Sequence, residues 1–181
     1  IEQALKNLPK LSKKNILDIG TGSGWIIISI IKERENCKAT AIDKSLKALK
    51  VAKLNAEMHH VQKKIKFLNI DVDKYLANKY DLIVSNPPYI KDIEILSLNK
   101  DVKLNEPKLA LSGGKSGLNK VFKVIKKSQK ILKTKGKLIL EIGDKQSKEV
   151  KKYLIKNNFN QIQVFKDLSR KDRCIVSTKA N

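Results

Sequence analysis

Short apolar runs alternate with longer amphipathic stretches along this chain, and that alternation restricts its fold more than any other feature. Strands are predicted where the apolar runs are bounded by turn residues, over residues 15–19, 38–42, 65–70, 80–84, 137–141, 161–165 and 174–178. Helices are predicted over residues 25–34, 45–59, 118–132 and 145–157. Such an order is typical of an α/β domain whose helices connect the strands of a mostly parallel sheet.

Turn and capping residues predict how some of these elements end. Ser45 is a suitable N-cap for the helix that follows it. The sequence Thr134-Lys135-Gly136 predicts that a glycine closes the helix over residues 118–132. The last two strands are separated by residues 166–173, too few for a helical crossover, so they should pair antiparallel. We therefore expect a seven-stranded, mostly parallel sheet with one antiparallel edge strand.

Composition supports one globular domain over residues 1–181, because 41% of the residues are hydrophobic and 31% are charged. No apolar run approaches the roughly 20 residues of a membrane span, and the N-terminus lacks a signal-peptide pattern. Cys37 and Cys174 have no CxxC spacing, so we expect neither a disulfide framework nor a metal site. A reducing compartment is the simple inference, either a bacterial cytoplasm or an organelle matrix.

The net charge of +21 raises the question of a nucleic-acid partner. However, only Arg34, Arg170 and Arg173 are arginines, and the lysines are scattered over every segment. The aromatic content of 5% is also low for stacking platforms. A functional basic face and a merely solvated exterior both remain open, and we expect nucleic acid only as a non-specific contact. We expect a monomer.

The segment Asp18-x-Gly20-x-Gly22-x-Gly24 lies between a predicted strand and a predicted helix, where α/β sheets bind ligands. Glycines let the backbone turn sharply and approach a ligand closely. The third glycine arrives one residue earlier than in the dinucleotide fingerprint GxGxxG, which favours a cofactor without a pyrophosphate. S-adenosylmethionine (AdoMet) fits this description. Another nucleotide and a purely structural turn are the alternatives.

Acidic residues follow the next two predicted strands. Asp43 ends the second strand, where its carboxylate could accept hydrogen bonds from both ribose hydroxyls or could begin the next helix. Asp71 ends the third strand and could meet the adenine amino group, although Asp71 and Asp73 could equally be turn residues. Val72 could contact the adenine face. Trp25 starts the first predicted helix, and we expect it to pack under the glycine loop rather than to stack on a base.

The sequence Asn86-Pro87-Pro88-Tyr89 follows an apolar run. Two prolines end a strand, because they lack a backbone donor and restrict φ. If the Asn86 side-chain oxygen and the Pro87 carbonyl accept two N–H bonds, they orient a flat nitrogen in line with a methyl donor. Tyr89 would pack against the planar group. These residues predict methyl transfer to an amide or amine nitrogen, and a strand-ending turn is the alternative.

With both motifs in place, the chain resembles class I AdoMet-dependent methyltransferases, which have a Rossmann-like fold. More closely, it resembles the protein-(glutamine-N5) methyltransferases that modify peptide-chain release factors (the HemK/PrmC family). Besides the two motifs, the matching residues are Asp101-Val102, Glu106-Pro107, Ala110-Leu111, Gly113-Gly114, Gly117-Leu118, Glu141-Ile142-Gly143, Asp167 and Asp172-Arg173. The long segment over residues 92–117 is what separates this family from other enzymes with the Asn-Pro-Pro-Tyr sequence.

The resemblance implies specific contacts. AdoMet contacts are implied for Gly20, Thr21, Gly22, Ser23, Gly24, Asp43, Val72 and Asn86. Contacts to the substrate glutamine are implied for Asn86, Pro87, Pro88 and Tyr89. Glu106 would either anchor the long loop or contact the substrate. The implied acceptor is the glutamine of the release-factor GGQ motif, and nucleic acid would then be met only non-specifically or through a ribosome-associated substrate.

Two other functions use the same residues. The four residues Asn86 to Tyr89 could hold the exocyclic amine of adenine in RNA or DNA. A non-catalytic AdoMet-binding module in a larger assembly is a third reading.

Family members also carry an N-terminal helical domain, whereas this chain opens at Ile1-Glu2-Gln3-Ala4-Leu5, which resembles the first helix of the catalytic domain. We therefore expect a catalytic domain without that docking domain.

Overall fold

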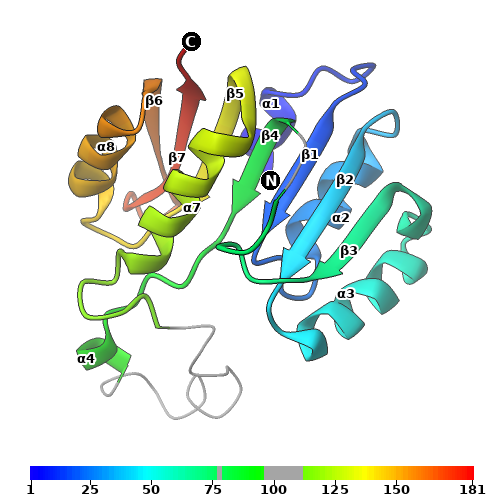
Figure 1. Ribbon diagram of the computed structural model, residues 1–181, viewed down its shortest axis with the longest axis horizontal. Helices are drawn as coiled ribbons and strands as arrows, with labels where there is room; N and C mark the ends of the chain where they lie inside the picture. The colour runs from blue at the N-terminus through cyan, green and yellow to red at the C-terminus, as the bar shows by residue number, and fades with distance from the viewer. Residues whose placement is uncertain (77–78, 96–111) are drawn as a thin grey trace.

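The computed structural model describes residues 1–76, 79–95 and 112–181. Its strands form one seven-stranded sheet in the order β3-β2-β1-β4-β5-β7-β6 (Figure 1). The strands are β1 Asn15–Ile19, β2 Lys38–Asp43, β3 Ile65–Asn69, β4 Tyr80–Ser85, β5 Leu132–Glu141, β6 Phe159–Lys166 and β7 Asp172–Lys179. The helices are α1 Glu2–Lys6, α2 Trp25–Glu33, α3 Leu46–Met58, the 3-10 helix η1 Gln62–Lys64, α4 Asp92–Ile95, α7 Asn119–Ile131 and α8 Ser147–Lys156.

Strand directions confirm the predicted sheet. Strands β3, β2, β1, β4 and β5 pair in parallel. Strand β7 is antiparallel to both of its neighbours, β5 and β6. The predicted antiparallel hairpin therefore forms the edge of the sheet, and its reversed strand β7 lies one place inside, between β5 and β6.

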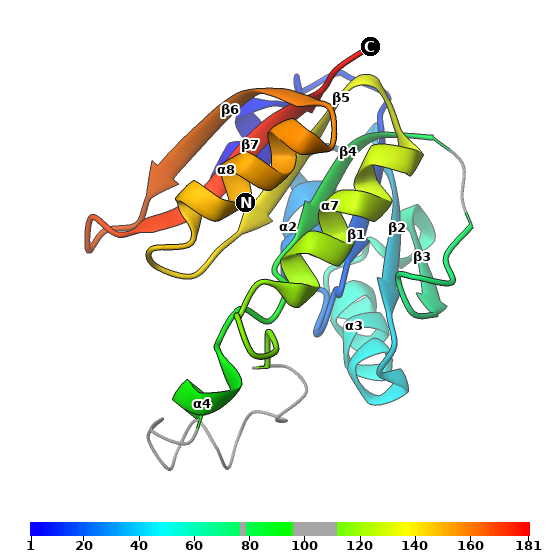
Figure 2. The ribbon, with the colours of Figure 1, turned by 60° about the vertical axis from the view of Figure 1, so that its left-hand side comes forward.

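Helices cover both faces of the sheet, as Figures 1 and 2 show. Side chains alternate along a strand, so Ile16 packs in the cluster that contains α1, α2 and α3 residues. Its neighbour Leu17 packs in the opposite cluster, with residues of α7 and α8. Both side chains are fully buried, and burying such a side chain stabilises the fold by roughly 1.5–3 kcal/mol. The sheet is thus held from both sides, which leaves its strand ends to form sites.

One predicted helix start is confirmed. Ser45 is the N-cap of α3, and its side-chain oxygen accepts a hydrogen bond from the backbone N–H of Ala48 at 3.2 Å. This bond satisfies one of the first N–H groups of the helix, which have no partner within the helix itself. The cap places the start of α3 directly after the end of β2.

The predicted glycine closure near Gly136 is wrong. Helix α7 ends at Ile131 and β5 begins at Leu132, which is fully buried and pairs with Tyr80. The positive φ of this region, +61°, belongs to Lys135, whereas Gly136 lies inside the strand. Pairing and burial of Leu132 outweigh the local turn preference, so the chain passes from helix to strand before it reaches the glycine.

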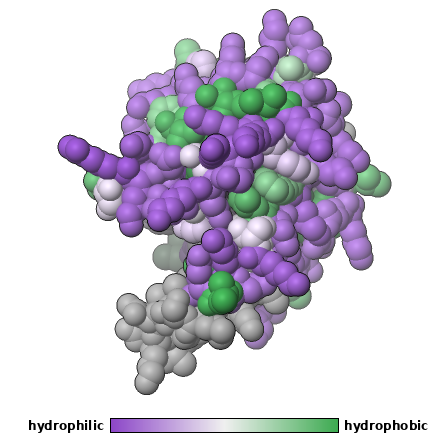
Figure 3. All heavy atoms as spheres, turned by 90° about the vertical axis from the view of Figure 1, so that its left-hand side faces the viewer, coloured by the Kyte–Doolittle hydropathy of each residue, from purple (hydrophilic) through white to green (hydrophobic). Residues whose placement is uncertain are grey.

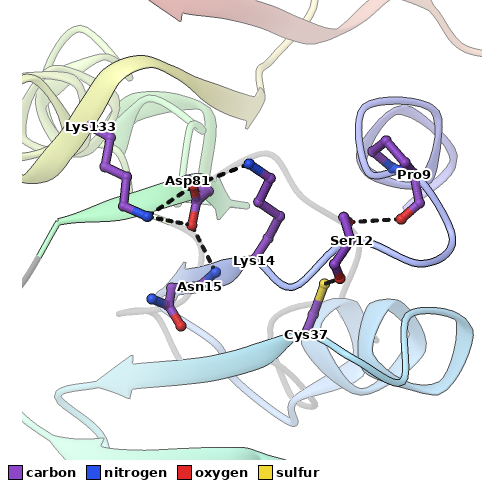
Figure 4. A network of polar contacts seen from close by, with 7 residues as sticks. All are labelled: Pro9, Ser12, Lys14, Asn15, Cys37, Asp81 and Lys133. Atoms are coloured by element: carbon purple, nitrogen blue, oxygen red, sulfur yellow. Dashed lines mark hydrogen bonds and ion pairs between the residues drawn. The ribbon is translucent and has the colours of Figure 1, made fainter.

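A polar network ties together the amino ends of several strands (Figure 4). Asp81 in β4 accepts a hydrogen bond from the Asn15 backbone N–H at 2.9 Å. Lys133 of β5 lies 2.9 Å from the same carboxylate and Lys14 lies 3.5 Å from it. Although burial opposes it, these donors hold the pKa of Asp81 below its ordinary value. These contacts hold the first residues of β1, β4 and β5 together at this edge of the sheet.

The first helix, α1, spans Glu2–Lys6, and Ile1 is its N-cap. No helix within residues 1–76, 79–95 and 112–181 combines the length and apolar character that crossing a membrane requires. In the same part of the chain, no three His, Cys, Asp or Glu side chains are grouped so that they could hold a metal ion.

Candidate functional site

The glycine loop joins β1 to α2 at the carboxyl edge of the sheet. Gly20, Gly22 and Gly24 have φ angles of +72°, +57° and +83°, a region that favours glycine. A Cβ atom at Gly20 or Gly22 would meet nothing within 4 Å. A Cβ at Gly24 would lie 2.9 Å from Ile28 and 3.1 Å from Ala52. The first two glycines therefore border open space, while the third packs inside the protein.

Hydrogen bonds bend this loop over the end of the neighbouring strand β2. The backbone N–H groups of Gly20 and Thr21 both donate to the Ile42 carbonyl, at 2.9 and 3.1 Å. The N–H of Gly22 donates to Asp43 Oδ2 at 2.9 Å. The exposed Ser23 follows, and its carbonyl accepts from Asn55 of α3 at 2.9 Å. The predicted loop residues are thus held together above two adjacent strand ends.

Asp43 has one of the two roles considered for it, at the start of α3, and it also holds the glycine loop. Its Oδ2 holds Gly22, and its Oδ1 accepts from the Ser45 backbone N–H at 2.8 Å. Each carboxylate oxygen keeps a further lone pair for another donor. The start of α3 is therefore anchored by Asp43 as well as by the Ser45 cap, and the ribose contact remains a prediction.

Asp18, at the beginning of the loop, is a buried carboxyl that is only 1% exposed. Its Oδ2 accepts a hydrogen bond from the Thr21 hydroxyl at 2.7 Å, whereas no described residue bonds to Oδ1. Burial raises its pKa to about 7, and the charge of Asp43 adds to this effect. Sequence reasoning treated Asp18 only as the start of the motif. The sequence signal for a further role was a carboxylate among the apolar residues Ile16, Leu17 and Ile19 of the strand.

The remaining predicted cofactor residues differ in their surroundings. Asp71 Oδ1 accepts from the Asp73 backbone N–H at 2.9 Å, which is the turn geometry considered as its alternative. Val72 is half-buried against the cluster that contains α7. The prediction that Trp25 packs under the loop is wrong, because its side chain is 67% exposed. The buried side of α2 is occupied instead by Ile27, Ile28, Ile30 and Ile31.

The segment from Asn86 to Tyr89 begins directly after β4, which lies next to β1. Ser85, the last residue of β4, is buried and donates a hydrogen bond from its hydroxyl to the Ile19 carbonyl at 2.7 Å. Ile19 is the last residue of β1 and precedes Gly20. The two predicted motifs therefore start from bonded neighbours. Asn86 is exposed, Pro87 is buried, and Pro88 and Tyr89 are half-buried.

Tyr89 is held on several sides. Gln146 Nε2 donates to the Tyr89 carbonyl at 3.0 Å, and the same side chain accepts from the Gly143 N–H at 2.9 Å. A Cβ at Gly143 would lie only 3.0 Å from the tyrosine ring. The Tyr89 hydroxyl donates to Glu141 Oε1 at 3.3 Å and accepts from Arg173 Nη1 at 3.2 Å. The residues at the end of β5 and in β7 that match the family named above thus meet around the Tyr89 side chain.

Part of the long segment over residues 92–117 reaches the same place. The Gly113 N–H donates to the Ile90 carbonyl at 2.8 Å. A Cβ at Gly117 would lie 2.6 Å from the Tyr89 carbonyl oxygen, so only glycine fits there. The other matching residues of the segment, Asp101-Val102, Glu106-Pro107 and Ala110-Leu111, lie outside the described residues.

A separate cavity of about 390 Å³ lies at the amino ends of the strands, the edge of the sheet opposite to the glycine loop. Half of its lining is lysine: Lys38, Lys63, Lys64, Lys66 and Lys79. The face that carries α8 is also largely hydrophilic (Figure 3). Positive charge therefore lines this cavity, and none of the cavity residues belongs to the predicted cofactor or acceptor motifs.

Comparisons with known proteins agree with this geometry. The family model described as "Methyltransferase small domain" matches residues 3–103. The chain is 38% identical over 182 residues to the release factor glutamine methyltransferase of Fusobacterium nucleatum, covering 99% of this chain and 51% of that protein. It is 35% identical over 187 residues to the bifunctional methyltransferase of Rickettsia felis, covering 100% of this chain and 36% of that protein.

The solved structure of a methyltransferase from Pyrococcus furiosus matches with a TM-score of 0.72 at 19% identity, over 99% of this chain and 81% of that one. This likeness confirms the predicted Rossmann-like fold of class I methyltransferases. The Fusobacterium nucleatum relative confirms, at the level of sequence, the predicted kinship with release factor glutamine methyltransferases. The chain spans about half or less of these two curated relatives.

Proposed function

The chain belongs to the methyltransferase small domain family, and from that premise we propose that it transfers a methyl group from AdoMet to the side-chain amide nitrogen of a protein glutamine. One observation carries the proposal. The hydrogen bond from Ser85 to Ile19 ties the end of β4 to the end of β1 at 2.7 Å. The glycine loop and the Asn86 segment therefore start side by side. The donor site and the acceptor site of one methyl transfer must be adjacent in this way.

The glycine loop and its neighbours would hold AdoMet. Gly20 and Gly22 border open space where a Cβ would meet nothing, so a ligand can approach the backbone closely there. Asp43 ends the adjacent strand and retains acceptor capacity for ribose hydroxyls. The Oδ1 atom of Asp18 has no partner within the described residues. The positively charged amino group of AdoMet, directly or through water, would supply a donor of fitting charge.

Asn86, Pro87, Pro88 and Tyr89 would hold the acceptor. An amide nitrogen is a weak nucleophile because its lone pair is delocalised, so orientation is what the protein must supply. The Asn86 side-chain oxygen and the Pro87 carbonyl would accept its two N–H bonds, and Tyr89 would pack against the amide plane. When bound, AdoMet would supply an activated methyl group: the nitrogen would bond to the methyl carbon as the sulfur–carbon bond breaks, and the surplus proton would leave to solvent. No strong general base is needed.

The substrate we propose is the GGQ glutamine of a peptide-chain release factor, and the partner is the release factor itself. The name of the Fusobacterium nucleatum relative supports this choice. We propose that the protein acts as a monomer and meets nucleic acid only non-specifically or through a ribosome-associated substrate. Methylation of an adenine amine would use the same four residues, but neither reported relative is named for a nucleic-acid substrate.

The test is incorporation of label from methyl-labelled AdoMet into purified release factor, with total RNA offered in a parallel reaction. We expect label in the release factor and none in a control factor whose GGQ glutamine is replaced by asparagine. The Asn86→Ala protein controls for contaminating activity. Label that enters RNA while the release factor stays unlabelled would overturn the proposal.

A further inference from the structure

Tyr89 lies at the centre of a polar cluster that joins three segments of the chain. We propose that Arg173, together with Glu141, is a positioning residue that fixes the Tyr89 ring against the methyl acceptor by holding the tyrosine hydroxyl. Arg173 would act through Tyr89 and would not touch the substrate. This inference rests on the proposed function and assigns residues that support its acceptor site.

The Arg173 guanidinium is held in one orientation. Its Nε and Nη2 atoms each lie 3.2 Å from Asp167 Oδ2, and its Nη1 donates to the Ile142 carbonyl at 3.3 Å. Nη1 also donates to the Tyr89 hydroxyl at 3.2 Å. A planar guanidinium with several fixed partners loses little freedom for each further bond that it makes. It is therefore a rigid support for the tyrosine.

Glu141 completes the hold on the hydroxyl, because its Oε1 atom accepts a hydrogen bond from that hydroxyl at 3.3 Å. Burial raises the pKa of Tyr89, and the nearby Glu141 carboxylate raises it further, so the phenol keeps its proton and remains a donor. The Arg173 guanidinium carbon also lies 5.8 Å from the centre of the tyrosine ring, within the range of a cation–π contact. Hydroxyl and ring are thus both restrained.

The reversed strand β7 explains how Arg173 reaches this place. Because β7 runs against β5, its first residues lie beside the last residues of β5, at the carboxyl edge of the sheet. Cys174 pairs with Glu141, and the Ile142 N–H donates to the Arg173 carbonyl at 2.9 Å. A parallel strand in the same position would deliver its first residues to the opposite edge. The antiparallel hairpin therefore contributes a side chain to the site.

A double-mutant cycle tests whether Arg173 acts through the hydroxyl. Tyr89→Phe keeps the ring and removes the hydroxyl, and Arg173→Ala removes the support. Because small displacements of a reacting group cost up to about 100-fold in rate, we expect each change alone to lower kcat by about 10- to 100-fold. We expect KM for release factor and Kd for AdoMet to change less than about twofold. In the Tyr89→Phe background, Arg173→Ala should cost less than about twofold more.

Two variants control for side effects. Arg170→Ala removes an exposed arginine of the same hairpin and should leave kcat unchanged. Arg173→Lys keeps the positive charge but lacks the planar guanidinium with its several donors. Its kcat should therefore recover only part of the loss that Arg173→Ala causes. Equal losses from Arg173→Ala in both backgrounds, or a raised KM with unchanged kcat, would overturn the proposal. The second result would instead indicate direct contact with the substrate.

A measurement without substrate covers the case in which methyl transfer fails. The chain has four tyrosines, so 3-fluorotyrosine labelling gives a simple fluorine NMR spectrum in which Tyr89→Phe assigns the Tyr89 signal. We expect that signal to shift and narrow in Arg173→Ala and to stay unchanged in Arg170→Ala. An unchanged signal in Arg173→Ala refutes the positioning role. Absence of methyl transfer by the wild-type protein, with the expected NMR response, counts against the proposed function alone.

Discussion

Replacing Asp18 by asparagine should make stability less dependent on pH. Burial raises the pKa of Asp18 from 3.8 to about 7. The carboxyl therefore ionises at a higher pH in the folded protein than in the unfolded chain. A group with a raised folded pKa contributes stability that is present in full below the unfolded value and is lost as pH rises through the folded value. The loss therefore falls between about pH 4 and about pH 7.

The magnitude follows from the size of that change. Three pH units at about 1.4 kcal/mol each give a total of about 4 kcal/mol, and the part that falls between about pH 5 and about pH 8 is about 2.5 kcal/mol. Asparagine can still accept the Thr21 hydroxyl bond, which is 2.7 Å long in the wild-type protein. Its buried NH₂ group costs about 1–3 kcal/mol, but this cost is independent of pH.

Urea unfolding of the wild-type and Asp18→Asn proteins at about pH 5 and about pH 8 isolates the contribution of Asp18. The other titrating groups affect both proteins equally, so they cancel when one pH response is subtracted from the other. Without AdoMet, the wild-type protein should lose about 2.5 kcal/mol more than Asp18→Asn between about pH 5 and about pH 8. Calorimetry at about pH 8 should show AdoMet binding about tenfold weaker in Asp18→Asn, as for loss of one charged partner. Identical pH responses of the two proteins would refute the reasoning.

Three further predictions separate binding, catalysis and folding. Asp43→Ala should weaken AdoMet binding with little effect on kcat at saturating AdoMet, and an unchanged Kd by calorimetry would count against the ribose contact. Asn86→Ala should lower kcat by about 10²–10³ while AdoMet affinity changes less, and near-normal turnover would remove Asn86 from the mechanism. Gly24→Ala should lower the free energy of unfolding by about 1–3 kcal/mol because its Cβ would crowd Ile28 of α2 and Ala52 of α3. Gly20→Ala, whose Cβ meets open space, should cost less stability but should impair AdoMet binding; equal destabilisation of the two variants would contradict this contrast.

Local chemistry was enough to predict most elements and the positions of both motifs. The period of apolar residues distinguishes strands from helices, and the Ser45 cap is a bond between residues three positions apart. The antiparallel hairpin followed from the length of its connection alone. These features depend on neighbouring residues, so the sequence contains them directly.

What the sequence could not show depends on distant contacts. Leu132 enters β5 because it pairs with Tyr80, which lies 52 residues away, and this pairing overrides the glycine signal at Gly136. Asp18 is buried in a strand that pairs with β2 on one side and β4 on the other, and its Oδ1 atom has no partner among the described residues. Arg173 and Tyr89 are 84 residues apart, and only the reversal of β7 brings them together.

The order of the strands, more than either motif alone, determines whether the proposed transfer is geometrically possible. Because β1 lies between β2 and β4, the loop after β1 bonds to the Ile42 carbonyl on one side, while Ser85 bonds to Ile19 on the other. Asp43 therefore ends one of the strands that flank β1, and Asn86 follows the other. Strand β5 comes next to β4 and ends at Glu141, within reach of the Tyr89 hydroxyl. Any rearrangement that separated β1 from β4 would leave both motifs intact and still move the proposed donor and acceptor sites apart.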